Sequence, residues 1–226
     1  MVEGVGIRSS ELRARGRAAL AAGQVALDTP PEDGGRWGLT ALLRPTGAVL
    51  ASLVDLADRA SAVAGPGHWM HGATEVHLTI RTFEPHRRVI GEDDPRLSRY
   101  RQALAAAVVG LIPFHLRLRG LSPHPRGVAV LGEPVEETAD LLRLRLWEAL
   151  RSDETADGPP QRDWYANLVH FAAPVSCPAD VVAWCDARAD LDVGTLRFSD
   201  VEVVRWSWDG MRMRATTLDL VSLCAG

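Results

Sequence analysis

Apolar residues follow two alternating spacings along this chain. Where they recur every three or four positions they indicate helices, and where they recur every second position they indicate strands. The first spacing predicts helices over residues 9–22, 47–64, 95–108, 135–151 and 178–188. The second predicts strands over residues 37–43, 74–82, 114–118, 128–131, 164–173, 195–206 and 211–220. Strands and helices therefore alternate through the chain, which indicates an α+β fold.

The strand predicted over residues 74–82 has the clearest alternation. One face carries Val76, Leu78 and Ile80, and the other carries Glu75, His77, Thr79 and Arg81. This pattern is typical of a half-buried strand. The polar segment 152–160, by contrast, has no periodicity and is expected to be a flexible loop.

The composition is that of a soluble globular protein. The chain has 226 residues, of which 46% are hydrophobic and 24% charged, enough to bury a sizeable core. No apolar run is long enough to span a membrane, and residues 1–25 lack the pattern of a signal peptide. We therefore expect a cytoplasmic protein without a membrane partner. The cysteines Cys177, Cys185 and Cys224 form no Cys-x-x-Cys pair and predict neither a disulfide framework nor a zinc site.

The chain contains no lysine, so all 25 of its basic residues are arginine. This excludes functions that need a lysine amine, such as a Walker phosphate loop, a pyridoxal Schiff base or a kinase-type lysine. Arginine remains well suited to phosphate because its guanidinium meets two oxygens at once, although a GC-rich genome explains the same bias. The net charge of −4 disfavours binding to duplex DNA. A small anionic ligand fits these constraints better.

The polar face of the strand over residues 74–82 can carry chemistry. His77 and Thr79 are two positions apart, so their side chains emerge on the same side, and Arg81 extends that side. Histidine exchanges a proton near neutral pH, a threonine hydroxyl hydrogen-bonds a phosphate oxygen, and arginine neutralises the anion. The simpler interpretation is a solvated polar face, because a His-x-Thr pattern is short.

The second candidate histidine, His170, has different neighbours. Strict alternation places it on one face with Ala166, Leu168 and Ala172, where a lone histidine is usually a core residue. The functional alternative is a pocket whose floor is formed by the small neighbours, with the imidazole as its reactive group. Tyr165 is a candidate to stack on a base, although aromatic side chains more often pack in a core.

A metal site is the competing interpretation. His68, His71 and His77 fall within ten residues, and Glu84 and His86 follow. Imidazoles at such spacing can bind zinc. The segment has neither the helical His-Glu-x-x-His pattern nor a cysteine pair, however. We expect no metal and no other cofactor, and place His68, Trp69 and His71 at the rim of a cleft instead.

Two segments together resemble the two-histidine (2H) phosphoesterase superfamily, which includes RNA 2′,3′-cyclic phosphodiesterases and 2′-5′ RNA ligase-like proteins. They are His77-Leu78-Thr79-Ile80 and the second histidine in 167–171, Asn-Leu-Val-His-Phe. The resemblance covers Trp37 to the C-terminus. It implies a bilobal fold, with two antiparallel β-sheets and outer helices around a central cleft. Residues 37–226 would form this single domain, and residues 1–36 an N-terminal extension.

The resemblance also implies roles for individual residues. His77 and His170 would be the catalytic acid and base of a metal-independent phosphodiesterase, with the assignment of each left open. Thr79, Arg81, Tyr165 and Trp37 would bind a cyclic nucleotide or RNA end. Ala172 stands where the superfamily has a second hydroxyl, and Ser176, Thr216 and Thr217 are candidates to replace it. The alternative function is a nucleotide- or phosphometabolite-binding module with little or no turnover. The sequence leaves the oligomeric state open.

Overall fold

The computed structural model describes residues 3–91, 93–151 and 161–223, with side chains from residue 10 onward. The helices in these ranges are α1 (Glu3–Ala21), α2 (Gly47–Ala64), α3 (Pro95–Val108), α4 (Thr138–Leu150) and α5 (Pro178–Asp186). The strands are β1 (Thr40–Leu43), β2 (Trp69–Met70), β3 (Leu78–Thr82), β4 (Phe114–His124), β5 (Gly127–Pro134), β6 (Trp164–His170), β7 (Asp192–Phe198), β8 (Asp200–Trp208) and β9 (Met213–Ser222). None of the helices in the described ranges has both the length and the hydropathy that crossing a bilayer requires.

The strands form one curled sheet built from two halves. Its order is β7-β4-β5-β6-β3-β1-β8-β9, with β2 paired to the end of β6, and neighbouring strands are antiparallel. The halves meet where β3 lies beside β6, and the ladder between these strands has the single pair Leu78–Ala166. The predicted α+β architecture is confirmed. Its two antiparallel sheets are joined through this one pair into a continuous sheet.

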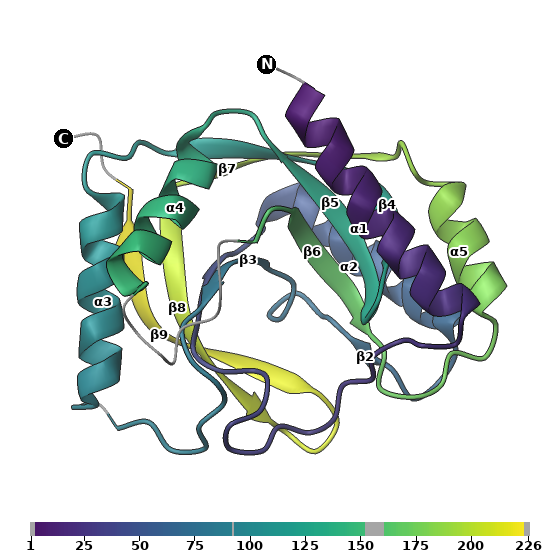
Figure 1. The fold of residues 1–226 in the computed structure, drawn as a ribbon, viewed down its shortest axis with the longest axis horizontal. Coiled ribbons are helices and arrows are strands. Elements are labelled where there is room, and N and C mark those ends of the chain that lie inside the picture. Colours follow the sequence, from purple (N-terminus) through teal and green to yellow (C-terminus); the bar gives the residue numbers. More distant parts are fainter. Residues whose placement is uncertain (1–2, 92, 152–160, 224–226) are drawn as a thin grey trace.

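The helices lie on the outside of the curled sheet and leave its inner side open (Figure 1). Helices α1 and α5 pack on β4, while α3 and α4 pack against each other near β9 and β3. Helix α2 precedes β3 in sequence, yet it packs on β6, β7 and α5 of the other half. Helix α4 is displaced in the opposite direction: it follows β5 in sequence, but it contacts α3 and β3 of the other half. Each half of the sheet is thus covered in part by a helix from the other.

Local sequence explains where several elements begin and end. Helix α3 starts at Pro95 because the Asp94 carboxylate accepts hydrogen bonds from the amides of Arg96 and Leu97, and because proline needs no amide partner at this position. Helix α2 ends at Gly65, whose φ of 95° lies in the region that glycine adopts without strain. These two helices and α5 lie within about two residues of their predicted bounds.

Some predicted bounds were wrong. The strand expected over residues 195–206 is divided at Ser199, where the chain leaves the edge of one half and enters the other half as β8. Strand β4 continues to His124, so the strands predicted over 114–118 and 128–131 are joined by a tight hairpin. Strand β2 was not predicted, because two residues are too few for a periodicity. The loop expected over 152–160 lies outside the described residues.

Candidate active site

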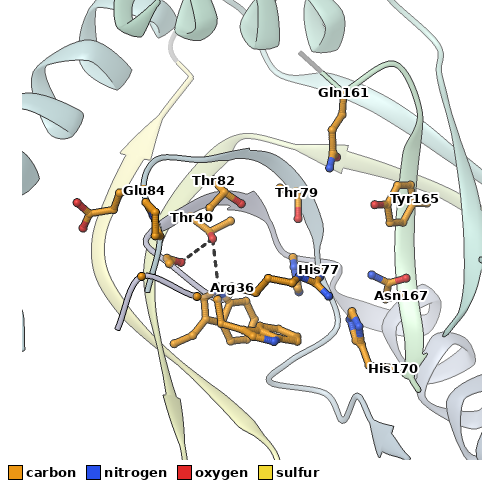
Figure 2. Close-up of a pocket in the computed structure, with 16 residues that line it drawn as sticks. Arg36, Thr40, His77, Thr79, Thr82, Glu84, Gln161, Tyr165, Asn167 and His170 are labelled. Carbon is orange, nitrogen blue, oxygen red and sulfur yellow. Dashed lines mark hydrogen bonds between the residues drawn. The ribbon is translucent and has the colours of Figure 1, made fainter. Parts of the chain in front are cut away.

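A pocket of about 490 Å³ opens where the two halves of the sheet meet (Figure 2). Its walls come from the loop before β1, from β1, β3 and β6, and from the segment that follows β3. The lining residues are Gly34, Gly35, Arg36, Trp37, Gly38, Thr40, His77, Thr79, Thr82, Glu84, Pro85, Gln161, Tyr165, Asn167, His170 and Trp206. The pocket therefore contains both predicted histidines, together with several hydroxyl and amide side chains.

His77 stands immediately before β3 and is 8% exposed. Its Nδ1 donates a hydrogen bond of 2.6 Å to the main-chain oxygen of Glu75, which fixes the proton on that nitrogen. Burial lowers the pKa of His77 to about 4, although the Glu75 hydrogen bond acts in the opposite direction. At neutral pH the imidazole is therefore uncharged, with a lone pair on Nε2. Such a group can accept a proton from a reacting oxygen.

His170 ends β6 and is bound to a buried carboxylate. Its Nδ1 lies 2.7 Å from Oδ2 of Asp28. The other carboxylate oxygen of Asp28, Oδ1, pairs with Arg36 and lies 3.6 Å from Arg126. Burial opposes ionisation of Asp28, yet the His170 hydrogen bond and the neighbouring positive charges hold its pKa below the ordinary value. Burial also lowers the pKa of His170, and Asp28 partly offsets this. Asp28 thus orients the imidazole and stabilises its protonated form.

Aromatic rings enclose the two histidines. The Trp206 ring lies 4.9 Å from His77, and the Trp37 ring lies 4.9 Å from His170 and 5.2 Å from Trp206, measured between ring centroids. His71 is buried between the pair, 5.9 Å from His77 and 4.8 Å from His170. In Figure 2 the rings of His77 and His170 point into the same space from β3 and β6. This apolar surround explains why protonation of both histidines is disfavoured.

Two β-bulges decide which residues of β3 and β6 face the pocket. In β3, Ala41 and Leu42 of β1 pair with Arg81 and Thr79, so Ile80 is an extra residue. The bulge shifts the alternation by one position. Thr82 consequently lines the pocket, while Arg81 does not. The alternation predicted from sequence places Arg81 on the His77 face, and the structure corrects it.

The same correction applies to β6. Val128 and Ala129 of β5 pair with Val169 and Asn167, so Leu168 is the extra residue. His170 therefore lies on the side of Tyr165 and Asn167, and not with Ala166 and Leu168 as strict alternation predicts. The bulge brings the histidine into the pocket although its neighbours in sequence are apolar.

The predicted substrate-binding position Ala172 lies outside the pocket. It follows the end of β6, packs against an aromatic cluster that contains Trp69 and Trp206, and its amide donates to Nδ1 of His68. Ser176 and the β9 residues Thr216 and Thr217 do not line the pocket either. No hydroxyl is therefore missing from the pocket wall at position 172, because that position is not part of the wall.

The other predicted residues, Thr79, Tyr165 and Trp37, do line the pocket. Trp37 has a left-handed backbone with φ of 72°, a conformation that costs a non-glycine residue of order 1–3 kcal/mol. Gly38, next to it, allows the chain to approach β3, because a Cβ there would lie 1.6 Å from the Glu84 carbonyl oxygen. Close contact between this loop and the segment after β3 places Trp37 over the pocket.

Of the residues considered for a metal site, His71 lies beside His77, whereas His68, His86 and Glu84 have partners elsewhere. His68 contacts the Ala64 carbonyl oxygen, His86 contacts the Trp37 carbonyl oxygen, and Glu84 pairs with Arg87. Within residues 3–91, 93–151 and 161–223 no group of three or more His, Cys, Asp or Glu is arranged to hold a metal ion. His68, Trp69 and His71 were expected at the cleft rim but do not line the pocket.

Solved structures share this architecture, although no family model and no curated protein sequence matches the chain. E. coli LigT complexed with 3′-AMP aligns with a TM-score of 0.60 and 12% identity, over 83% of this chain and 98% of LigT. A protein described as a phosphoesterase aligns with a TM-score of 0.58 and 16% identity, over 85% and 99%. The protein TT0787 of Thermus thermophilus aligns with a TM-score of 0.56 and 22% identity, over 82% and 97%.

The chain has the LigT fold. This confirms the fold expected from the resemblance to the two-histidine phosphoesterases. At 12–22% identity, the alignments compare folds and do not assign the residues of the pocket.

Sequence reasoning left Asn167 open between the pocket edge and the opposite face, and it did not select Arg36, which lines the pocket, or Asp28, which binds His170. Asn167 is two positions from Tyr165 on the same strand, so alternation places both side chains on one face, which is a weak signal. Asp28 and Arg36 lie in a breaker-rich segment and had been placed in the N-terminal extension. Asp28 reaches His170 across 142 positions of sequence, and no local pattern indicates such a contact.

The buried histidines predict a loss of stability in mild acid. The pKa of His77 is about 4 in the folded protein and about 6.5 when unfolded. Between these values the unfolded chain binds the proton more readily, so the free energy of unfolding decreases as the pH falls from 6.5 to 4, by about 3 kcal/mol for this residue. Urea denaturation of wild type and His77→Asn across this range measures the difference. If the free energy of unfolding fell equally with pH in the two proteins, this prediction would be contradicted.

Proposed function

We propose that this chain is a two-histidine phosphoesterase that hydrolyses a phosphodiester, with a 2′,3′-cyclic nucleotide or an RNA 2′,3′-cyclic phosphate end as substrate. One observation carries the proposal. His77 and His170 line the same pocket, and each has Nδ1 engaged in a hydrogen bond that leaves Nε2 for the ligand. Two imidazoles arranged in this way suit a general base and a general acid.

The different partners of the histidines support a different role for each. His77 donates to a neutral carbonyl oxygen and, unlike His170, is not held by a carboxylate that would favour its protonated form, so it suits the base. His170 is held by the Asp28 carboxylate, which favours the imidazolium, so it suits the acid. His77 Nε2 takes a proton from water while the water oxygen bonds to phosphorus. The bond from phosphorus to the leaving 2′- or 3′-oxygen breaks, and protonated His170 gives its proton to that oxygen.

The pocket also suits the size and charge of a nucleotide. Its volume is about 490 Å³, Arg36 supplies a guanidinium at its edge, and Thr79 supplies a hydroxyl beside His77. E. coli LigT, which has the same fold, has been crystallised with 3′-AMP and with phosphate. These observations support a phosphorylated nucleoside as the ligand. Trp37 is the candidate to contact its base.

A binding module without turnover is the second candidate. It is favoured by the lowered pKa of both histidines, since burial disfavours the protonated form of each imidazole in the unliganded protein. A general acid has to carry a proton, so catalysis requires that the bound anion and Asp28 restore it to His170. If they do not, the same pocket retains the nucleotide unchanged.

Hydrolysis assays in the presence of EDTA test the proposal. Nucleoside 2′,3′-cyclic phosphates are incubated with the wild-type protein, with and without the chelator, and the monophosphate products are measured. We expect turnover that EDTA does not reduce. Turnover abolished by EDTA would contradict metal-independent chemistry, and binding without any product would favour the second candidate.

A further inference from the structure

The pair Leu78–Ala166 marks the centre of a local two-fold relationship between β3 and β6. Both residues are fully buried on the core side of the sheet. In an antiparallel pair the flanking residues of both strands then point to the opposite side, here toward the pocket. These residues are His77 and Thr79 on β3, and Tyr165 and Asn167 on β6, and all four line the pocket.

The correspondence extends beyond these four residues. In β3 and the residue just before it the pocket-lining positions are 77, 79 and 82, and on β6 they are 165, 167 and 170. Each strand therefore has the same spacing, because each has a bulge after its second pocket residue. Within this relationship Tyr165 corresponds to His77, Asn167 to Thr79, and His170 to Thr82. The second half of the pocket thus has a Tyr-x-Asn segment where the first half has His-x-Thr.

The side chains of this segment are directed at those of β3. Figure 2 shows the Tyr165 hydroxyl on the side of Thr79 and the amide nitrogen of Asn167 on the side of His77. The other amide atom, Oδ1 of Asn167, is buried and has no hydrogen-bond partner among the described residues. In this orientation the amide presents its nitrogen, a donor, to the pocket.

We propose that Tyr165 and Asn167 form the second phosphate-binding pair of this pocket, in which the phenol and the amide donate to non-bridging phosphate oxygens opposite Thr79. The inference rests on the proposed function for the identity of the ligand. It assigns to β6 the role that the sequence had led us to expect at position 172.

The chemistry of the two groups fits this role. A phosphate anion accepts hydrogen bonds only, so the groups that bind it have to be donors. Burial raises the pKa of Tyr165, so its hydroxyl keeps its proton throughout the neutral range. The amide of Asn167 donates at every pH. The pair would therefore bind phosphate through neutral donors, without adding charge to the pocket.

Equilibrium binding of inorganic phosphate, measured by titration calorimetry, tests the assignment without requiring turnover. We expect Tyr165→Phe and Asn167→Ala each to weaken binding by about 10- to 150-fold, the range for a lost hydrogen bond to a charged group. Asn167→Asp should abolish binding, because a carboxylate repels the anion. Ala172→Ser and Thr216→Val, outside the pocket, should bind as wild type does. Thermal melts identify any variant that fails to fold.

The outcomes separate this inference from the proposed function. Wild-type affinity in folded Tyr165→Phe and Asn167→Ala, or no measurable binding of phosphate by the wild type, would overturn the inference. A gain in affinity with Ala172→Ser would also count against it, because that residue would then face the ligand. Phosphate binding that depends on both residues, in a protein that hydrolyses no cyclic nucleotide, would support the inference and refute the proposed function.

Discussion

Replacing His77 with glutamine should lower the proposed rate of phosphodiester hydrolysis by about 10²- to 10⁴-fold, the usual contribution of a general base. Glutamine has a reach similar to that of the histidine Nε2 but carries no basic nitrogen, so the loss measures the missing proton acceptor. His170→Gln should cost a similar factor through loss of the general acid. Steady-state rates on a nucleoside 2′,3′-cyclic phosphate measure both, with the exposed His115→Gln as the matched control.

The leaving group distinguishes the two histidines. An alkoxide needs a proton as it departs, whereas 4-nitrophenolate leaves readily without one. On a 4-nitrophenyl phosphodiester, His170→Gln should therefore keep most of the wild-type rate, while His77→Gln remains slow. The double variant should be little slower than the worse single variant, because residues that act together in one step are not additive. Equal losses on both substrates for His170→Gln would exclude it as the acid.

Asp28→Asn should reduce hydrolysis of the cyclic nucleotide by about 10²-fold, at the lower end of the range for general acid catalysis. The substitution keeps the shape of the side chain but removes the charge that favours the protonated form of His170. The pKa of His170 falls further, and less of the protein carries the proton that the leaving oxygen needs. Hydrolysis of the 4-nitrophenyl diester should be nearly unchanged, which a general loss of structure could not produce.

Asp28→Asn should also lower the free energy of unfolding. Asp28 is buried beside His170, Arg36 and Arg126, and removing one partner of a charged hydrogen bond costs about 1–3 kcal/mol. The control is Asp192→Asn, which breaks an exposed ion pair with Arg117 and should change stability little, because solvent screens exposed pairs. Chemical denaturation at pH 7 compares the two variants. Equal free energies of unfolding in the two variants would show that the buried contacts of Asp28 do not stabilise the fold.

Much of the fold could be predicted because its elements have strong local periodicity. Helix α2 has its predicted bounds, and α3 was marked by Asp94 and Pro95, whose capping roles are read directly from sequence. What could not be predicted is how the strands combine. The passage of the chain from β7 to β8 at Ser199 joins different halves of the sheet, and nothing local distinguishes it from one continuous strand.

The pocket was less predictable than the fold because its composition depends on two inserted residues. Ile80 and Leu168 are ordinary apolar strand residues, and neither is a glycine that would mark a bulge. Each nevertheless shifts the alternation that follows it. One bulge replaces Arg81 with Thr82 in the pocket, and the other brings in His170. His77 and Thr79 precede their bulge, so their shared face was predicted correctly.

Helices α2 and α4 each pack on the half of the sheet that the other part of the chain forms, so we expect the two halves to fold together. A cut between Val108 and Phe114 would separate α2 from β6 and β7, and α4 from α3 and β3, so both pieces would expose apolar surface. Contacts between distant parts of the sequence have to form before either lobe is complete, which is typical of slow folding. The two pieces should instead assemble with each other, as complementary fragments of one cooperative unit.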